Sequence, residues 1–191
     1  MIGIIFGPPG SGKGTQAAHI QRESQLKHLS TGQILRAEVA HGSEIGKEVA
    51  RIMAAGDLIP DDAIVSIVRK RLPEAEAGRG VLLDGFPRTL EQARALDEML
   101  ASEGHQVDFV IALEVPEEEL VERILNRAAV EGRPDDTREA IEERMREYHK
   151  LTEAVLDHYR KLGVPVKVVD GTGDPDAVFE RIRGAMGISS R

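Results

Sequence analysis

The sequence predicts an α/β protein with a five-stranded parallel sheet and helices on both faces of that sheet. Short apolar runs alternate along the chain with longer segments of helical periodicity, and this alternation is typical of parallel sheets covered by helices. In addition, the first apolar run leads directly into a glycine-rich loop that contains a lysine, and a helical pattern follows the loop. Ligands of such sheets bind beyond the carboxyl ends of the strands.

Four apolar runs are predicted as strands: Ile2–Phe6, Val81–Leu83, Phe109–Leu113 and Val164–Val169. Each is bounded by Gly, Pro or Asp, and most contain β-branched residues. A fifth, weaker strand is predicted at Lys27–Leu29. Nearly continuous apolar runs fit strands that are buried on both faces.

The helices are predicted from apolar residues that recur every three, four or seven positions. The longest contains Ile141, Met145, Tyr148, Val155 and Tyr159. Asp136 is expected to cap this helix, with Glu139 three residues later. A last helix is expected to begin at Asp174-Pro175. Segments 89–101 and 117–127 also have helical patterns.

Length and composition limit the possible functions. A chain of 191 residues with 41% apolar and 30% charged residues suits one globular domain. The net charge of −8 excludes a polyanion-binding surface over the whole protein, and 3% aromatic residues argue against a nucleic-acid stacking platform. Without cysteine there is no disulfide or thiolate metal site. No apolar run is long enough to span a membrane and no signal peptide begins the chain, so we expect a cytoplasmic protein.

The loop after the first strand has the sequence Gly7-Pro8-Pro9-Gly10-Ser11-Gly12-Lys13-Gly14-Thr15. Between a strand and a helix, it is typical of a phosphate-binding loop, so the fold is predicted to be of the P-loop NTPase type. Its glycines let backbone N–H groups reach phosphate oxygens, and Lys13 supplies a full charge. Gly14 stands where this pattern usually has Ser or Thr, which weakens any assignment of a hydroxyl to magnesium. The alternative is a glycine-rich turn that binds nothing.

The loop and four further segments resemble the nucleoside monophosphate kinases. These segments, in order, are Ser30-Thr31-Gly32 with Leu35-Arg36, Leu82–Thr89 with Gln92, Asp135-Asp136 between Arg133 and Arg144, and Asp170–Gly173. The chain is most similar to adenylate kinases of the short-lid form, because only residues 128–132 separate Arg127 from Arg133. There is no room for a zinc-bound lid, so no zinc is expected.

The resemblance implies Mg²⁺-dependent, reversible phosphoryl transfer, ATP + AMP = 2 ADP, which maintains the balance of adenine nucleotides. It implies a monomer that binds ATP, AMP and ADP and neither nucleic acid nor membrane. One domain spans 1–191. Its core is expected at 1–29, 60–126 and 137–191, with a helical monophosphate-binding segment at 30–59 and a short lid at 127–136.

Two nucleotides bring several negative charges together, so a chain of net charge −8 must gather its arginines at one place. The candidates are Arg36, Arg88, Arg123, Arg133 and Arg144. By resemblance the first two hold the AMP phosphate, and the last three surround the ATP phosphates and the transferring group. For Arg123 the alternative is an ion pair with Glu119, one helical turn earlier.

Three sets of site residues follow from the resemblance. The catalytic set is Lys13, Asp84, Arg88, Arg123, Arg133 and Arg144. The ATP-binding set is Gly10, Ser11, Gly12, Lys13, Gly14, Thr15, Arg123, Arg127 and Gly173. The AMP-binding set is Thr31, Arg36, Met53, Leu58, Ile59, Gly85, Arg88, Gln92, Arg133 and Arg144.

Individual residue types support some of these roles. Asp84 ends a buried strand, where an acidic residue can orient magnesium through its waters, and no residue is predicted as a direct metal ligand. Gln92 can donate and accept hydrogen bonds, as an adenine edge requires. Thr31 could instead cap the helix after Ser30, and Met53 could be a core residue.

Three alternative functions agree less well with the sequence. A UMP/CMP kinase of the same fold tends to have Asn where this chain has Thr89 and Gln92. A P-loop GTPase needs an Asn-Lys-x-Asp motif, which is absent. An inactive nucleotide-binding scaffold would be expected to lack the lysine or one of the arginines.

Overall fold

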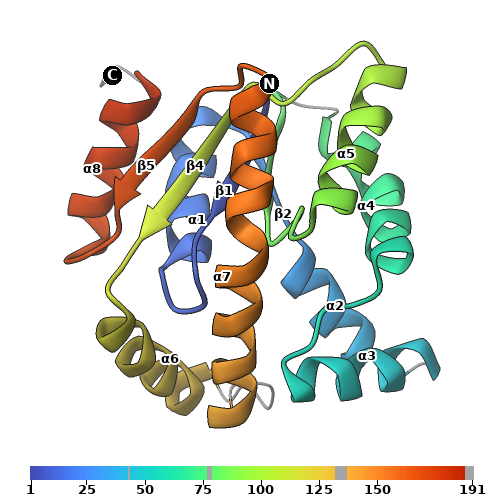
Figure 1. The fold of residues 1–191 in the computed structure, drawn as a ribbon, viewed down its shortest axis with the longest axis vertical. Helices are drawn as coiled ribbons and strands as arrows, with labels where there is room; N and C mark the ends of the chain where they lie inside the picture. Colours follow the sequence, from blue (N-terminus) through green and yellow to red (C-terminus); the bar gives the residue numbers. More distant parts are fainter. Residues whose placement is uncertain (43, 77–78, 132–136, 188–191) are drawn as a thin grey trace.

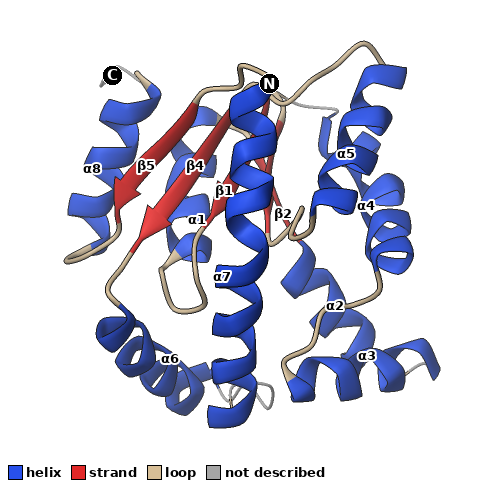
Figure 2. Ribbon diagram, in the orientation of Figure 1, coloured by secondary structure: helices blue, strands red, loops and turns tan. Residues whose placement is uncertain are grey.

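The computed structural model describes residues 1–42, 44–76, 79–131 and 137–187 (Figure 1). Five strands form one sheet in the order β2-β3-β1-β4-β5, and every neighbouring pair is parallel (Figure 2). The strands are β1 (Ile2–Phe6), β2 (Lys27–Ser30), β3 (Val81–Asp84), β4 (Phe109–Glu114) and β5 (Val166–Asp170). The predicted five-stranded parallel sheet is confirmed.

Helices cover both faces of the sheet. They are α1 (Lys13–Ser24), α2 (Thr31–Ala40), α3 (Glu44–Ala55), α4 (Asp61–Glu76), α5 (Leu90–Ser102), α6 (Glu117–Glu131), α7 (Arg138–Lys161) and α8 (Pro175–Met186). Apolar side chains of α1 and α8 pack with Ile5 of β1, whereas those of α4, α5 and α7 pack with Ile4 on the opposite face. Alternate residues of one strand therefore enter two different halves of the core.

Several boundaries differ from the prediction; helix α6, for example, continues to Glu131 and does not end at residue 127. Helix α7 is capped by Thr137, whose hydroxyl accepts the N–H of Ala140 at 3.2 Å, so the prediction of Asp136 as cap was wrong. Helix α1 begins at Lys13, inside the predicted loop and not after it, because the Gln16 N–H already donates to the Gly12 carbonyl at 3.0 Å. The cap at Asp174 with Pro175 is confirmed.

Strand β5 begins two residues later than predicted. The Val164 N–H donates to the Tyr159 carbonyl at 3.0 Å, which ties Val164 to the end of α7. Pro165 follows and has no N–H to donate to the ladder. The strand therefore starts at Val166, where backbone donors are again available to β4.

Two groups of helices extend beyond the carboxyl ends of the strands, α6 on one side and α2 with α3 on the other, with α7 between them (Figure 1). A small apolar cluster of Leu120, Ile124, Ile141 and Met145 joins α6 to α7. Helix α3 contacts both α2 and α7. Helices α2, α3, α6 and α7 thereby surround the carboxyl edge of the sheet, where ligands of α/β proteins bind. Within the described part of the chain, no helix is long and apolar enough to cross a membrane.

Candidate active site

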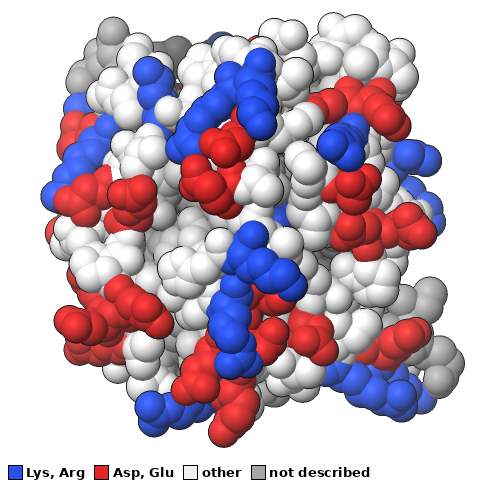
Figure 3. Space-filling view, viewed as in Figure 1, with Lys and Arg blue, Asp and Glu red and all other residues white. Residues whose placement is uncertain are grey.

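A cleft of about 910 Å³ lies at the carboxyl edge of the sheet. It is lined by the β1–α1 loop, by α2 and the end of α3, by the β3–α5 loop, and by α6 and α7. On the outer face seen in Figure 3, acidic and basic side chains of the described residues are interspersed and form no broad basic area. The cleft itself is lined by five basic side chains, those of Lys13, Arg36, Arg88, Arg123 and Arg144.

The glycine-rich loop wraps around its own lysine. The Lys13 ammonium donates to the carbonyl oxygens of Gly7 at 2.6 Å and Pro8 at 3.0 Å. Gly10 has φ +82°, and a Cβ atom there would lie 2.9 Å from the carbonyl oxygen of Leu120 in α6. Only glycine allows this backbone conformation and this close approach. The loop, the N-terminus of α1 and Lys13 together form an arrangement suited to a phosphate group.

Asp84 ends β3 beside the loop and pairs with a histidine from the neighbouring strand. The Nε2 of His28 on β2 lies 3.0 Å from Oδ2 of Asp84, and both side chains are nearly buried. Burial acts to raise the pKa of Asp84. The His28 hydrogen bond and the charges of Lys13 and Arg88 together outweigh burial, so the pKa of Asp84 is lowered. Asp84 is therefore held as a carboxylate next to the loop.

Three arginines line the same cleft: Arg36, Arg88 and Arg144. Arg88 donates from Nε to the Gly85 carbonyl at 2.9 Å, and Arg144 donates to the Met53 carbonyl at 3.2 Å. Burial and the positive charges of Arg144 and Arg36 lower the pKa of Arg88. The negative charge of Asp84 acts in the opposite direction, but the net shift is downward. The Arg88 side chain is still open to the solvent of the cleft. Such mutual repulsion makes the site favourable for a multiply charged anion.

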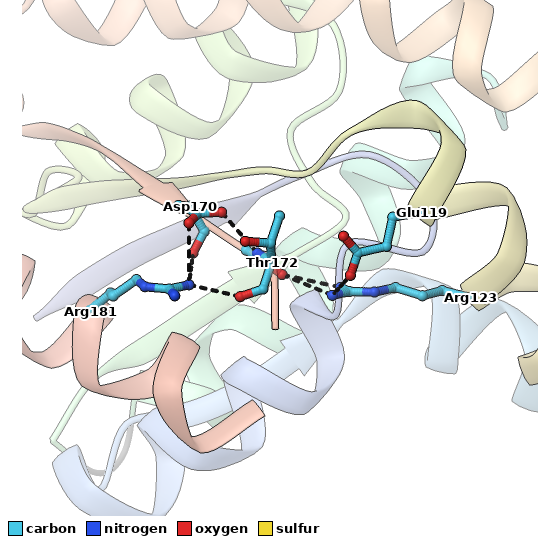
Figure 4. Close-up of polar contacts among 6 residues, drawn as sticks. Glu119, Arg123, Asp170, Thr172 and Arg181 are labelled. Carbon is cyan, nitrogen blue, oxygen red and sulfur yellow. Dashed lines mark hydrogen bonds and ion pairs between the residues drawn. The ribbon is translucent and has the colours of Figure 1, made fainter. Parts of the chain in front are cut away.

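Arg123 comes from α6 and contacts the loop after β5 (Figure 4). Both of its terminal nitrogens lie 3.2 Å from the Gly171 carbonyl oxygen, and Nη2 also lies 2.5 Å from Oε1 of Glu119. The ion pair between Arg123 and Glu119, which the sequence predicts as the alternative to a role in the site, is thus present. Arg123 nevertheless also lines the cleft. Arg181 of α8 donates to the carbonyls of Asp170 and Thr172 at 2.9 and 2.8 Å, which fixes the same loop from its other side.

Thr31 and Gln92 line the part of the cleft between α2 and α5. Ser30, not Thr31, caps α2, and the Thr31 hydroxyl donates to the Asp84 carbonyl at 3.3 Å. The alternative of Thr31 as a cap was wrong. Gln92 is buried, with its side-chain oxygen accepting the Arg88 N–H at 2.7 Å and its nitrogen donating to Asp61 at 2.7 Å.

Most of the predicted site residues meet in this one cleft. Its lining includes Gly10, Gly12, Lys13, Gly14, Thr15, Thr31, Arg36, Met53, Leu58, Ile59, Asp84, Gly85, Arg88, Gln92, Arg123 and Arg144. Ser11, in the loop itself, is buried, and its hydroxyl has no hydrogen-bond partner among the described residues. Gly173 is exposed on the turn before α8 and is not part of the lining. Residues 132–136 of the predicted lid, which include Arg133, and the side chain of Arg127 lie outside what the structure describes.

Two residues that support the site were missed from the sequence. His28 has no role in the sequence prediction, although it lies in the weak strand predicted at Lys27–Leu29, two residues before β2 ends at Ser30. Asp61 begins α4, where an acidic residue is normally only a favourable partner of the helix dipole. The contacts of His28 with Asp84 and of Asp61 with Gln92 join residues that are 56 and 31 positions apart, so neither contact follows from local sequence.

Comparison with known proteins identifies the family. The adenylate kinase family model matches residues 5–164. The chain is 50% identical over 185 residues to an adenylate kinase of Thermus thermophilus, covering 97% of this chain and 96% of the relative. It is 45% identical to adenylate kinases of Xylella fastidiosa and Xanthomonas euvesicatoria, covering 96% of this chain and 98% of each relative. The chain belongs to the adenylate kinase family and is a nucleotide phosphotransferase.

Proposed function

We propose that the cleft carries out the adenylate kinase reaction, ATP + AMP = 2 ADP, with separate donor and acceptor sites on either side of Asp84. The observation that carries this proposal is the convergence of Lys13, Arg88 and Arg144 in one cleft. A phosphate oxygen of AMP attacks the terminal phosphorus of ATP, and the bond from that phosphorus to the bridging oxygen breaks. The cations offset charge on the transferring group, which is the main requirement of phosphoryl transfer.

The acceptor site is proposed between α2 and α5. Arg36 and Arg88 would hold the AMP phosphate with their planar guanidinium groups, which suit pairs of phosphate oxygens. Thr31 and Gln92 would contact the base. The apolar side chains beside them, which include Met53, Leu58 and Ile59, would cover its faces. Gly85 leaves room for this approach, since its φ is +80° and Thr31 is already close.

The donor site is proposed at the phosphate loop, where Gly10–Thr15 and Lys13 would hold the phosphates of ATP. Arg123 would contact them from α6, and Arg144 would contact the transferring group from α7. Roles for Arg127, Arg133 and a backbone contact at Gly173 remain part of the proposal by resemblance. The proposal of a short lid at 127–136 that closes over ATP also rests on the resemblance.

Adenylate kinases use Mg²⁺, which offsets charge on the nucleotide phosphates when it is bound. No cluster of three His, Asp or Glu side chains that could hold a metal occurs in the described part of the chain. Asp84 is the carboxylate next to the loop, and His28 occupies only one of its oxygens. These residues fit a hydrated ion that the nucleotide would mainly hold, and Asp84 would orient one of its waters.

The segment 30–59 is proposed to move as a unit over AMP and to exclude water, which would favour transfer over hydrolysis. Its hydrogen bond between the Met53 carbonyl and Arg144 supports a coupling between this segment and the cleft arginines. The remaining parts, 1–29, 60–126 and 137–191, would form a core that stays fixed. A single domain of this kind is proposed to act as a monomer.

The test is diphosphate formation from Mg·ATP with AMP, CMP, UMP or GMP as separate acceptors. Strong turnover with AMP alone is expected, while preference for CMP or UMP would overturn the proposed acceptor. Arg88→Ala should lower kcat/KM by about 10³-fold, in the range of arginines that stabilise phosphoryl transfer. Arg94→Ala is the matched control, because Arg94 is on α5 and pairs with Glu91 away from the cleft. Near-normal turnover of folded Arg88→Ala would refute the arginine assignment.

A further inference from the structure

The Gln92 side chain is held in one orientation by two groups of opposite hydrogen-bonding character. Its Oε1 accepts the backbone N–H of Arg88 at 2.7 Å, and its Nε2 donates to Oδ1 of Asp61 at 2.7 Å. A backbone N–H can only donate and an ionised carboxylate can only accept. Rotating the amide by half a turn would place like groups against each other at both contacts.

Asp61 is itself held in place. Its second oxygen, Oδ2, accepts the hydroxyl proton of Thr89 at 2.9 Å. Thr89 is the N-cap of α5, and the same hydroxyl accepts the backbone N–H of Gln92 at 3.1 Å. Asp61 is the first residue of α4, where the helix dipole favours a negative charge. The carboxylate therefore links the N-termini of two helices behind the cleft.

The two contacts leave a defined hydrogen-bonding pattern. An amide group has two N–H donors and two oxygen lone pairs. Within the described residues, Gln92 uses one of each in the contacts above. One donor and one acceptor remain, in positions that cannot be exchanged. Gln92 lines the cleft and is only 2% exposed, so bulk water hardly competes for its contacts with Arg88 and Asp61.

We infer that Asp61 is a positioning residue that makes the acceptor site select 6-aminopurine over 6-oxopurine monophosphates by fixing the Gln92 amide. This inference rests on the proposed role of Gln92 in reading the acceptor base. A 6-aminopurine presents an acceptor at N1 beside a donor at N6, whereas a 6-oxopurine presents a donor at N1 beside an acceptor at O6. The two edges have the same shape and opposite polarity, so a fixed amide accepts one and rejects the other.

The test compares kcat/KM for AMP and for IMP in the whole enzyme with saturating Mg·ATP. Asp61→Asn keeps the shape but offers Gln92 either a donor or an acceptor, so the AMP-to-IMP ratio should fall about tenfold, as expected for one charge-assisted hydrogen bond. Asp61→Glu keeps an acceptor-only group and should retain more of the ratio. Asp62→Asn is the matched control, because Asp62 is the next residue of α4 and is exposed. Its ratio should equal that of the unaltered enzyme.

Both acceptors are measured on one sample, so the ratio does not depend on how much of a variant is folded. Equal losses with AMP and IMP in Asp61→Asn would overturn the inference and leave Asp61 only a structural link between α4 and α5. Gln92→Ala separates this failure from that of the proposed function. If Gln92→Ala lowers the ratio and Asp61→Asn does not, only the role of Asp61 is refuted. If Gln92→Ala leaves the ratio unchanged, the proposed base contact itself is refuted, and the inference with it.

Discussion

Replacing His28 by leucine should destabilise the protein through Asp84. The imidazole and the carboxylate are 3.0 Å apart, with side-chain exposures of 9% and 11%. A hydrogen bond to a charged, buried group contributes about 1.5–3 kcal/mol, and removing one partner leaves the other in an unfavourable environment. We therefore expect His28→Leu to lower the free energy of unfolding by about 2 kcal/mol. For a chain of this size, that corresponds to a fall in Tm of about 6 °C.

The same variant should change the acid side of the stability profile. Because the pKa of Asp84 is lowered in the folded protein, its contribution to stability is complete above the unfolded pKa of about 3.9 and is lost as the pH falls through the folded pKa. In His28→Leu the raising effect of burial is opposed only by Lys13 and Arg88. The pKa of Asp84 should then rise, and acid unfolding should begin at a higher pH.

Urea unfolding at pH 7 and melting temperatures measured between pH 3 and pH 7 provide the assay. His105→Leu is the control, because His105 is an exposed histidine in the loop after α5. Its profile should match that of the unaltered protein. An unchanged urea midpoint for His28→Leu would refute the reasoning, and so would a loss of stability that is the same at every pH.

Three further predictions concern single contacts. In Gly85→Ala the new Cβ would lie 2.8 Å from Oγ1 of Thr31, at a backbone φ of +80° that disfavours alanine. KM for AMP should therefore rise at least tenfold while KM for ATP is unchanged. A parallel rise in both KM values would contradict this prediction. Arg181→Met should raise KM for ATP severalfold, because it releases the loop that holds Arg123. Arg183→Met should not raise it, because among the described residues this variant loses only a pair with Glu180 on the same helix. Tyr159→Phe should raise Tm by about 3 °C, because the buried Tyr159 hydroxyl has no hydrogen-bond partner among the described residues. A lower Tm would contradict this and would indicate that the hydroxyl binds a buried water.

The sequence by itself determined the features whose cause is local. Buried parallel strands need apolar runs, so Ile2–Phe6 and its counterparts were predicted with nearly correct bounds. The phosphate loop is contiguous, and its glycines and Lys13 have the same chemistry wherever the chain folds. The cap at Asp174 depends only on the next few residues. Even here, Thr137 replaced the expected Asp136, because two polar residues in a row leave the choice of cap to backbone geometry.

Only the tertiary structure decided which distant side chains meet. His28 reaches Asp84 because β2 lies next to β3, and periodicity along the chain does not encode strand order. Asp61 reaches Gln92 because α4 and α5 begin side by side across a separation of 31 residues. The sequence identified Gln92 as a group that can both donate and accept. Which way its amide faces is decided by the partners that the fold brings to it, since an isolated amide can rotate and these two contacts allow one orientation.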